Sequence, residues 1–129
     1  MTSDIVILGG ARTAIGTFGG SLSSLPPIEL ATAASKAALE RSGLDAAQVG
    51  TVVFGHVINT EPRDMYLSRV AAMQAGVPNG TPAMNVNRLC GSGAQAIVSA
   101  VQSLALGDAD FAVAGGAESM SRAPYAVPA

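Results

Sequence analysis

Cysteine, histidine and aromatic residues are scarce in this chain of 129 residues. It has one cysteine, one histidine and no tryptophan, and aromatic residues make up 4% of it. A single cysteine excludes a disulfide within the chain, and no cluster of cysteine and histidine has the spacing of metal ligands. The sequence therefore predicts no metal site.

Charge is also scarce. Charged residues make up 12% of the chain and the net charge is −2, with seven cationic residues that are dispersed along it. The absence of a basic stripe excludes nucleic acid as the expected partner. The charged share is about half that of an average soluble domain. We infer that another domain or subunit covers part of the surface.

Targeting and membrane-spanning signals are not evident. The first four residues lack a basic segment followed by a long apolar one, so we predict no signal peptide and a cytoplasmic location. The longest uncharged stretch, residues 89–107, contains glutamines, serines and glycines. We expect it to form a buried helix, with no membrane as a partner.

Short apolar runs alternate with longer segments of helical character. The predicted strands cover residues 5–8, 49–54, 83–86 and 111–114, and the predicted helices cover residues 27–43, 66–75 and 91–106. The order βαβαβαβ predicts parallel strands joined by helical crossovers, within a single α/β domain over residues 1–129. In such sheets functional residues gather beyond the carboxyl ends of the strands.

Cys90 lies at one of these ends, between the strand 83–86 and the helix that follows. The free N–H groups and the dipole of a helix start favour an anionic thiolate. Gly91 and Gly93 leave space beside the sulfur, and the Cys90 N–H could stabilise an oxyanion. These features predict a nucleophile, although a lone cysteine can also be a small buried hydrophobe.

Three other positions lie at strand ends or beside Cys90. Asn87 precedes the nucleophile and is predicted to shape its turn or to contact a partner subunit. His56, which follows the strand 49–54, is a candidate active-site neighbour or a hydrogen-bonded structural residue. Arg12 and Glu118 each follow an apolar run that ends in Gly-Gly, so they could form an ion pair across that edge.

Three motifs resemble those of one enzyme family. Asn-Arg-Leu-Cys-Gly-Ser-Gly-Ala-Gln-Ala at residues 87–96 resembles the acyl-enzyme motif of thiolases. Ala-Arg-Thr-Ala-Ile-Gly at 11–16 and Gly-Gly-Ala-Glu-Ser-Met-Ser at 115–121 resemble their first-strand and fourth-strand motifs. The resemblance covers essentially the whole chain. It implies part of a three-layer α/β/α thiolase fold with a mostly parallel sheet.

The resemblance also implies an activity, that of acetyl-CoA C-acetyltransferase, or β-ketothiolase. The Cys90 thiolate would take an acyl group from acyl-CoA as a thioester, and a second acetyl-CoA would condense with it to give a β-ketoacyl-CoA. Thiolysis is the reverse reaction. Coenzyme A thioesters would be substrates, no cofactor would be bound permanently, and the protein would be a homodimer or homotetramer.

Family motifs that are missing limit this expectation. Thiolases are considerably longer, and they also use a Gly-His-Pro histidine, an Asn-Glu-Ala-Phe asparagine and a Cys-x-Gly-Gly cysteine. None of these motifs is present, and His56 does not match the histidine motif. We expect residues 1–129 to be a truncated N-terminal thiolase domain, inactive alone, with most coenzyme A contacts elsewhere. A β-ketoacyl synthase-like enzyme and a non-catalytic fragment or subunit that needs a partner chain remain alternatives.

Overall fold

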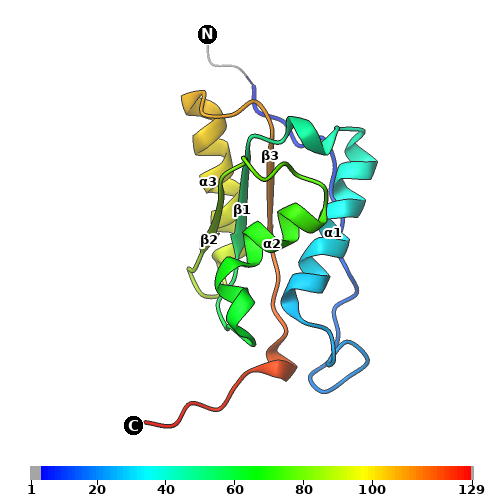
Figure 1. Cartoon of the computed structure of the whole chain (residues 1–129), viewed down its shortest axis with the longest axis vertical. Coiled ribbons are helices and arrows are strands. Elements are labelled where there is room, and N and C mark those ends of the chain that lie inside the picture. The colour runs from blue at the N-terminus through cyan, green and yellow to red at the C-terminus, as the bar shows by residue number, and fades with distance from the viewer. Residues whose placement is uncertain (1–3, 129) are drawn as a thin grey trace.

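The computed structural model describes residues 4–128, which form one layered α/β unit (Figure 1). The helices and strands, in chain order, are α1 (Pro27–Ser42), β1 (Thr51–Gly55), α2 (Leu67–Gln74), β2 (Ala83–Val86), α3 (Ser92–Leu106) and β3 (Ala112–Gly116). Short 3-10 helices lie at η1 (Ala46–Gln48), η2 (Pro62–Tyr66) and η3 (Met120–Arg122).

The sheet has the strand order β2-β1-β3, and both pairings are parallel. Val53 in the central strand pairs with Met84 on one side and with Ala114 on the other. Each crossover between paired strands contains a helix, as parallel pairing requires. The predicted α/β class and parallel sheet are confirmed, and the three carboxyl ends meet at one edge.

One face of the sheet carries most of the hydrophobic core. Val52 and Phe54 of β1 pack there with Ile28 of α1 and with Leu67 and Ala71 of α2. All five side chains are nearly inaccessible to solvent. Because alternate residues of a strand point to opposite faces, Val53 lies on the other side.

That other face is covered by α3 alone, through small side chains. Val53 packs against Ala96 and Ala100, which are buried. Alanines allow the helix backbone to lie close to the sheet. The outward residues Ile97 and Val98 are about half exposed, at 47% and 49%. The structure thus has three layers, but the third is one helix thick.

The bounds of α1 follow from its terminal residues. Pro26 and Pro27 open the helix, where a missing N–H leaves no bond unmade. Gly43 ends it with φ of 69°, a left-handed conformation that suits glycine. Glu29 in the first turn and Arg41 in the last complement the helix dipole.

The predicted first strand is not formed. Residues 5–8 contain no strand, and within residues 4–128 β3 pairs only with β1. The segment instead borders an apolar cavity of about 490 Å³ that is also lined by β3, α1 and α3. Ile7 is 83% exposed. An apolar run becomes a strand only where a neighbouring strand takes its hydrogen bonds, and here none does.

The prediction of a buried helix over residues 89–107 is wrong in its burial. Only 17% of Leu89–Leu106 is buried, and this stretch is apolar enough to cross a membrane by length and composition. The helix α3 itself has 15 residues, fewer than the roughly 20 that a bilayer needs. Its buried residues lie on a single stripe against the sheet.

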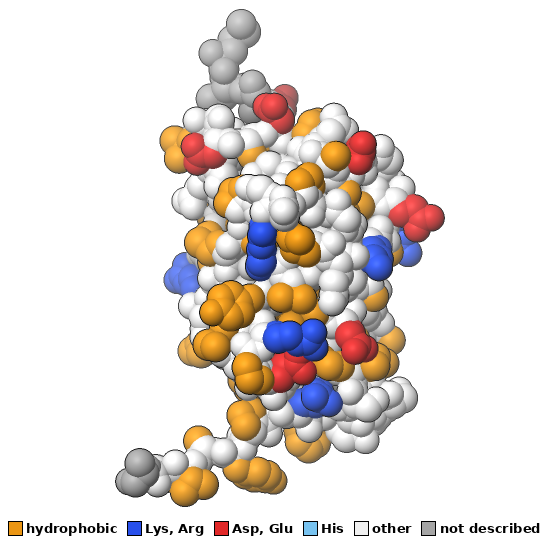
Figure 2. Space-filling view, viewed as in Figure 1, with side chains coloured by type: hydrophobic (Ala, Val, Ile, Leu, Met, Phe, Trp, Pro, Cys, Tyr) orange, Lys and Arg blue, Asp and Glu red, His pale blue; other side chains and the backbone are white. Residues whose placement is uncertain are grey.

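Charged side chains are scattered over the face that carries α1 and α2, without forming a stripe (Figure 2). Apolar side chains lie between them on the same face. The exposed apolar residues of α3 and of the N-terminal segment are consistent with the inference that further protein covers this unit.

Candidate functional site

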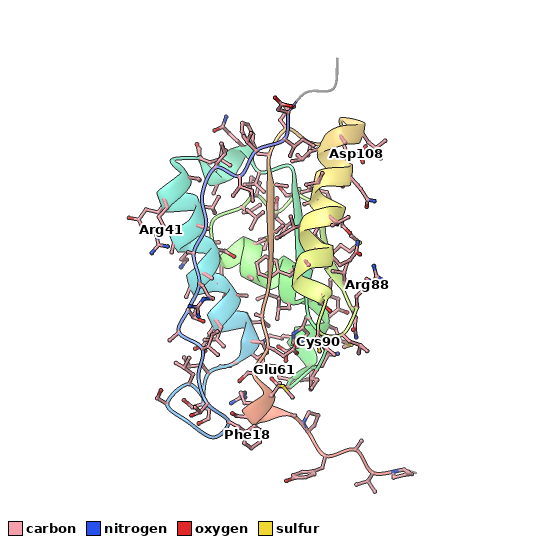
Figure 3. The ribbon with its side chains drawn as sticks, turned by 180° about the vertical axis from the view of Figure 1, so that it is seen from behind. Phe18, Arg41, Glu61, Arg88, Cys90 and Asp108 are labelled. Carbon is pink, nitrogen blue, oxygen red and sulfur yellow. The ribbon has the colours of Figure 1, made fainter. Side chains whose placement is uncertain are left out.

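Cys90 is an exposed free thiol at the carboxyl edge of the sheet. It follows β2 and lies directly before Gly91, the N-cap residue of α3. Figure 3 shows Cys90 at the end of α3, on the same end of the molecule as Glu61 and Phe18. The predicted placement of a thiol between a strand and a helix start is what the structure has.

A tight turn presents this thiol. Asn87 Oδ1 accepts a hydrogen bond from the Leu89 N–H at 3.0 Å, and the Gly91 N–H donates to the Arg88 carbonyl at 3.1 Å. Leu89 has φ of 52°, the left-handed region, which costs a leucine about 1–2 kcal/mol. The side chain of Asn87 therefore takes part in the turn that places Cys90.

Ser92 closes this turn, a role that the sequence did not single out. Its hydroxyl accepts from the Arg88 N–H at 2.8 Å and donates to the Leu89 carbonyl at 2.6 Å. The residue is 5% exposed. These bonds run back to the turn that precedes the helix, so Ser92 does not cap α3, whose N-cap is Gly91.

Glycines let the start of α3 touch the sheet. A Cβ on Gly55 would lie 2.5 Å from the carbonyl carbon of Ser92, and one on Gly116 would lie 3.4 Å from Gly93 Cα. The first distance is impossible for real atoms, so Gly55 is required there. A Cβ on Gly91 would make only an ordinary contact, so this glycine leaves space beside the thiol without being needed for packing.

A positive charge lies beside the first turn of α3. The Arg88 guanidinium donates to Gln95 Oε1 at 2.9 Å, and both side chains belong to the motif around Cys90. This bond holds the Arg88 side chain against the first turn of the helix.

His56 is buried rather than presented to the edge. Its side chain is 1% exposed, and Nδ1 lies 2.8 Å from the Ala117 carbonyl oxygen. A carbonyl oxygen only accepts, so Nδ1 carries the proton. Nε2 faces Asp64 Oδ2 at 4.0 Å. Among the bonds described for residues 4–128, none joins His56 to Cys90.

Two acidic residues flank this histidine, and neither was recognised from the sequence as its neighbour. Asp64 is fully buried, and its Oδ2 accepts from the N–H groups of Thr60 and Glu61 at 2.6 and 3.1 Å. Glu118 accepts from the Ile58 N–H at 2.8 Å. These contacts join residues up to 60 positions apart, which local sequence does not show.

The expected ion pair between Arg12 and Glu118 is not formed. The Arg12 guanidinium donates to the Thr13 carbonyl at 3.0 Å, whereas the Glu118 carboxylate is bonded to the backbone after β1. Both residues line a cavity of about 220 Å³ at the carboxyl end of β3. The Glu118 carboxylate instead accepts hydrogen bonds from the N–H groups of Val57 and Ile58, which would otherwise be unpaired.

The space around Cys90 is open. Neither the cavity of about 490 Å³ nor that of about 220 Å³ is lined by Cys90. Within the described part of the chain, no group of three or more His, Cys, Asp and Glu side chains is placed to hold a metal ion. The chemistry that the arrangement offers is nucleophilic attack by an accessible thiol.

Comparison with known proteins gives the family of this chain. Residues 5–129 match the family model described as thiolase, N-terminal domain. The chain therefore belongs to the thiolase family, in agreement with the motifs around Arg12, Cys90 and Glu118.

The relatives agree in sequence and in fold. Beta-ketothiolase BktB of Cupriavidus necator is 60% identical over the whole chain, which covers 33% of that protein. The cytosolic acetyl-CoA acetyltransferase of Mus musculus is 43% identical over 94% of the chain and 30% of that protein. The crystal structure of human mitochondrial 3-ketoacyl-CoA thiolase in complex with CoA is 37% identical, with a TM-score of 0.88 over 96% of the chain and 33% of that structure. The chain thus spans about a third of the length of the proteins it matches.

Proposed function

We propose that Cys90 is the acyl-carrying nucleophile of a thiolase that acts on coenzyme A thioesters. The observation that carries this proposal is the exposed thiol at the start of α3, within the thiolase-like motif of a chain that belongs to the thiolase family. The relatives named acetyl-CoA acetyltransferase and beta-ketothiolase support the same activity. The thiolase family match also favours it over a β-ketoacyl synthase.

In the first half-reaction the Cys90 thiolate attacks the thioester carbonyl of an acyl-CoA. The new bond joins Sγ to the acyl carbon, and the thiolate of coenzyme A leaves and takes up a proton. The Cys90 N–H is the candidate donor to the oxyanion that develops, since the N–H groups of Gly91 and Ser92 already donate to the Arg88 and Leu89 carbonyls. Gly91 leaves the approach to Sγ free of a side chain.

In the second half-reaction an acetyl-CoA loses an α-proton to a base, and its carbanion attacks the acyl carbon on Cys90. The Cys90 thiolate leaves, and a β-ketoacyl-CoA is released. Residues 4–128 place no histidine base beside the thiol, because the single histidine is buried and its Nδ1 is bonded to Ala117. We therefore propose that residues 1–129, as an N-terminal thiolase domain, form only the nucleophile half of the site.

Acyl transfer to Cys90 is tested in the full-length protein, meaning the complete polypeptide that carries this chain. After incubation with acetyl-CoA and digestion, mass analysis is expected to find one acetyl group on the Cys90 peptide. The C90A variant is the matched control and should lose that label. An acetylated cysteine elsewhere, with Cys90 free in the wild type, would contradict the proposal.

We also propose self-association and a cytoplasmic location. The edge strand β2 carries Met84 at 48% exposure, and Leu89 beyond it is 70% exposed, so this edge could pair with a second copy. A homodimer or homotetramer is expected by light scattering of the full-length protein, and a monomer would contradict it. The cytosolic mouse relative supports the location.

A further inference from the structure

We propose that His56 is a positioning residue for the nucleophile and that it acts through Nδ1 alone. Together with Glu118 it clasps two loops at the carboxyl edge, and this clasp holds the start of α3 where Cys90 needs to be. This inference rests on the proposed acyl transfer to Cys90.

The clasp consists of two sets of hydrogen bonds between the same two segments. From the β1 side, His56 Nδ1–H donates to the Ala117 carbonyl at 2.8 Å. From the β3 side, the Glu118 carboxylate accepts two hydrogen bonds. The Val57 N–H donates to Oε2 at 3.2 Å, and the Ile58 N–H donates to Oε1 at 2.8 Å. The segments that follow β1 and β3 are thereby tied in both directions.

The clasp lies next to the start of α3. The Ala117 N–H donates to the Gly55 carbonyl at 3.1 Å, so the segment after β3 is fixed to the end of β1. At the same point a Cβ on Gly55 would lie 2.5 Å from the Ser92 carbonyl carbon and one on Gly116 would lie 3.4 Å from Gly93 Cα, so both glycines face the start of α3. A displacement of either loop would therefore be passed by backbone contacts to the residues directly after Cys90.

The two ring nitrogens of His56 are not equivalent. Nδ1 is bonded to Ala117 and lies 3.4 Å from Glu118 Oε1. Nε2 is buried, and within residues 4–128 it has no hydrogen-bond partner. It lies 4.0 Å from Asp64 Oδ2. This oxygen already accepts hydrogen bonds from the Thr60 N–H, the Thr60 hydroxyl and the Glu61 N–H. The geometry assigns the positioning work to Nδ1.

Amide side chains can separate the two nitrogens. An asparagine places its amide nitrogen close to the position of Nδ1, whereas a glutamine places its amide close to that of Nε2. H56N should therefore keep the bond to Ala117, and H56Q should lose it. The clasp itself is tested from its other side by E118A.

The experiment measures Cys90 in the full-length protein in two ways. One is the rate of acetylation of Cys90 by acetyl-CoA, and the other is its rate of alkylation by iodoacetamide, which needs no thiolase activity. For acetylation by acetyl-CoA, H56Q and E118A are expected to lower kcat about tenfold or more with little change in KM. The reason is that a small misplacement of a reacting group has a large effect on its rate. H56N is expected to recover most of the rate lost in H56Q.

The control is T32V, which removes the partly buried hydrogen bond from Thr32 Oγ1 to Gln74 Oε1 at 2.8 Å, on the sheet face opposite α3. It should lower the Tm without changing either rate at Cys90. If H56Q and E118A behave like T32V, the positioning role is wrong. If H56N is impaired and H56Q is not, Nε2 is the working atom and the proposal is overturned.

The failure of the proposed function has a different signature. In that case wild-type Cys90 takes no acetyl group at all. The alkylation rates still compare H56N, H56Q and E118A, so the clasp is judged by them. Equal alkylation of Cys90 in all variants would refute the clasp, whatever the acetylation result.

Discussion

The two faces of the sheet are covered in different ways. On the face that α1 and α2 cover, the described residues form a cluster of ten buried apolar side chains. On the face that α3 covers, the corresponding cluster has three, and two of them are alanines. The first face is a hydrophobic core in the ordinary sense. The second is a close backbone contact that sets the position of the helix before which Cys90 lies.

This difference separates stability from placement. Burial of large apolar side chains supplies most of the folding free energy, and it is concentrated between the sheet and α1–α2. The contact of α3 with the sheet at Gly55 involves little apolar area, but it leaves no space for a Cβ at that residue. Mutations on the α1–α2 face should therefore mainly lower stability, whereas mutations on the α3 face should mainly change the position of Cys90.

The largest loss of stability is expected for L67A. Leu67 is fully buried between α2 and the sheet. Its truncation should lower the free energy of unfolding of the 129-residue chain by about 2–5 kcal/mol, through lost burial and a residual cavity. Urea denaturation followed by circular dichroism measures this, and a loss below about 1 kcal/mol would show that the core is not concentrated here.

G55A should disturb placement more than its size suggests. The new Cβ would lie 2.5 Å from the Ser92 backbone, so α3 must move away from the sheet. We expect about 1–3 kcal/mol of destabilisation, as for other overpacked sites, together with slower acetylation of Cys90 in the full-length protein. G80A is the control, since a Cβ there meets nothing within 4 Å. Unchanged acetylation in G55A would break the proposed link.

The C-caps of the two outer layers should respond alike. Gly43 ends α1 with φ of 69°, and Gly107 ends α3 with φ of 79°. Because both are left-handed caps with open space around the Cα, G43A and G107A should each cost about 1 kcal/mol of unfolding free energy. Thermal denaturation of the two variants is the measurement. A large difference between the two variants would show that the two faces of the sheet also differ in how their helices end.

The smallest effect is expected for V98A on the outer face of α3. Val98 is 49% exposed, so its truncation should change the stability of the 129-residue chain by no more than about 0.5 kcal/mol. In the full-length protein the same change should cost more, since we infer that further protein covers this face. Equal small effects in both chains would contradict that inference.

Several elements could be predicted closely because local chemistry defines them. The strand at residues 83–86 has the predicted bounds, and α1 begins and ends near the predicted proline and glycine signals. The strands predicted at 49–54 and 111–114 are shifted by one or two residues, to 51–55 and 112–116. The hydrophobic run specifies a strand, but hydrogen bonds to its neighbours set its ends.

Other features depend on contacts that a local pattern does not contain. The apolar run at residues 5–8 has the composition of a strand, but no neighbouring strand pairs with it. The apolar stretch at 89–107 predicted a buried helix, whereas only the stripe that includes Ala96 and Ala100 is buried against the sheet. An apolar composition indicates that a segment will be buried, but it does not indicate which other segment will pack against it.

The candidate site was predicted in its local part only. Cys90, Gly91 and Asn87 are neighbours in sequence, and the structure places them in one turn at the carboxyl edge. The bond from His56 to Ala117 spans 61 positions, and that from Ile58 to Glu118 spans 60. Long-range polar contacts of this kind follow from the folded topology, so the sequence showed the residues but not their partners.

The contact of Gly55 and Gly116 with the start of α3 has a consequence for protein engineering. A Cβ on Gly55 would collide with the Ser92 backbone, so any side chain at this position would push the start of α3 away from the sheet. Exposed loop positions outside the turn of Asn87 and Ser92 and outside the clasp of His56 and Glu118 are the ones to redesign for new substrates. The same contact makes Gly55 the position that a designed library should leave untouched.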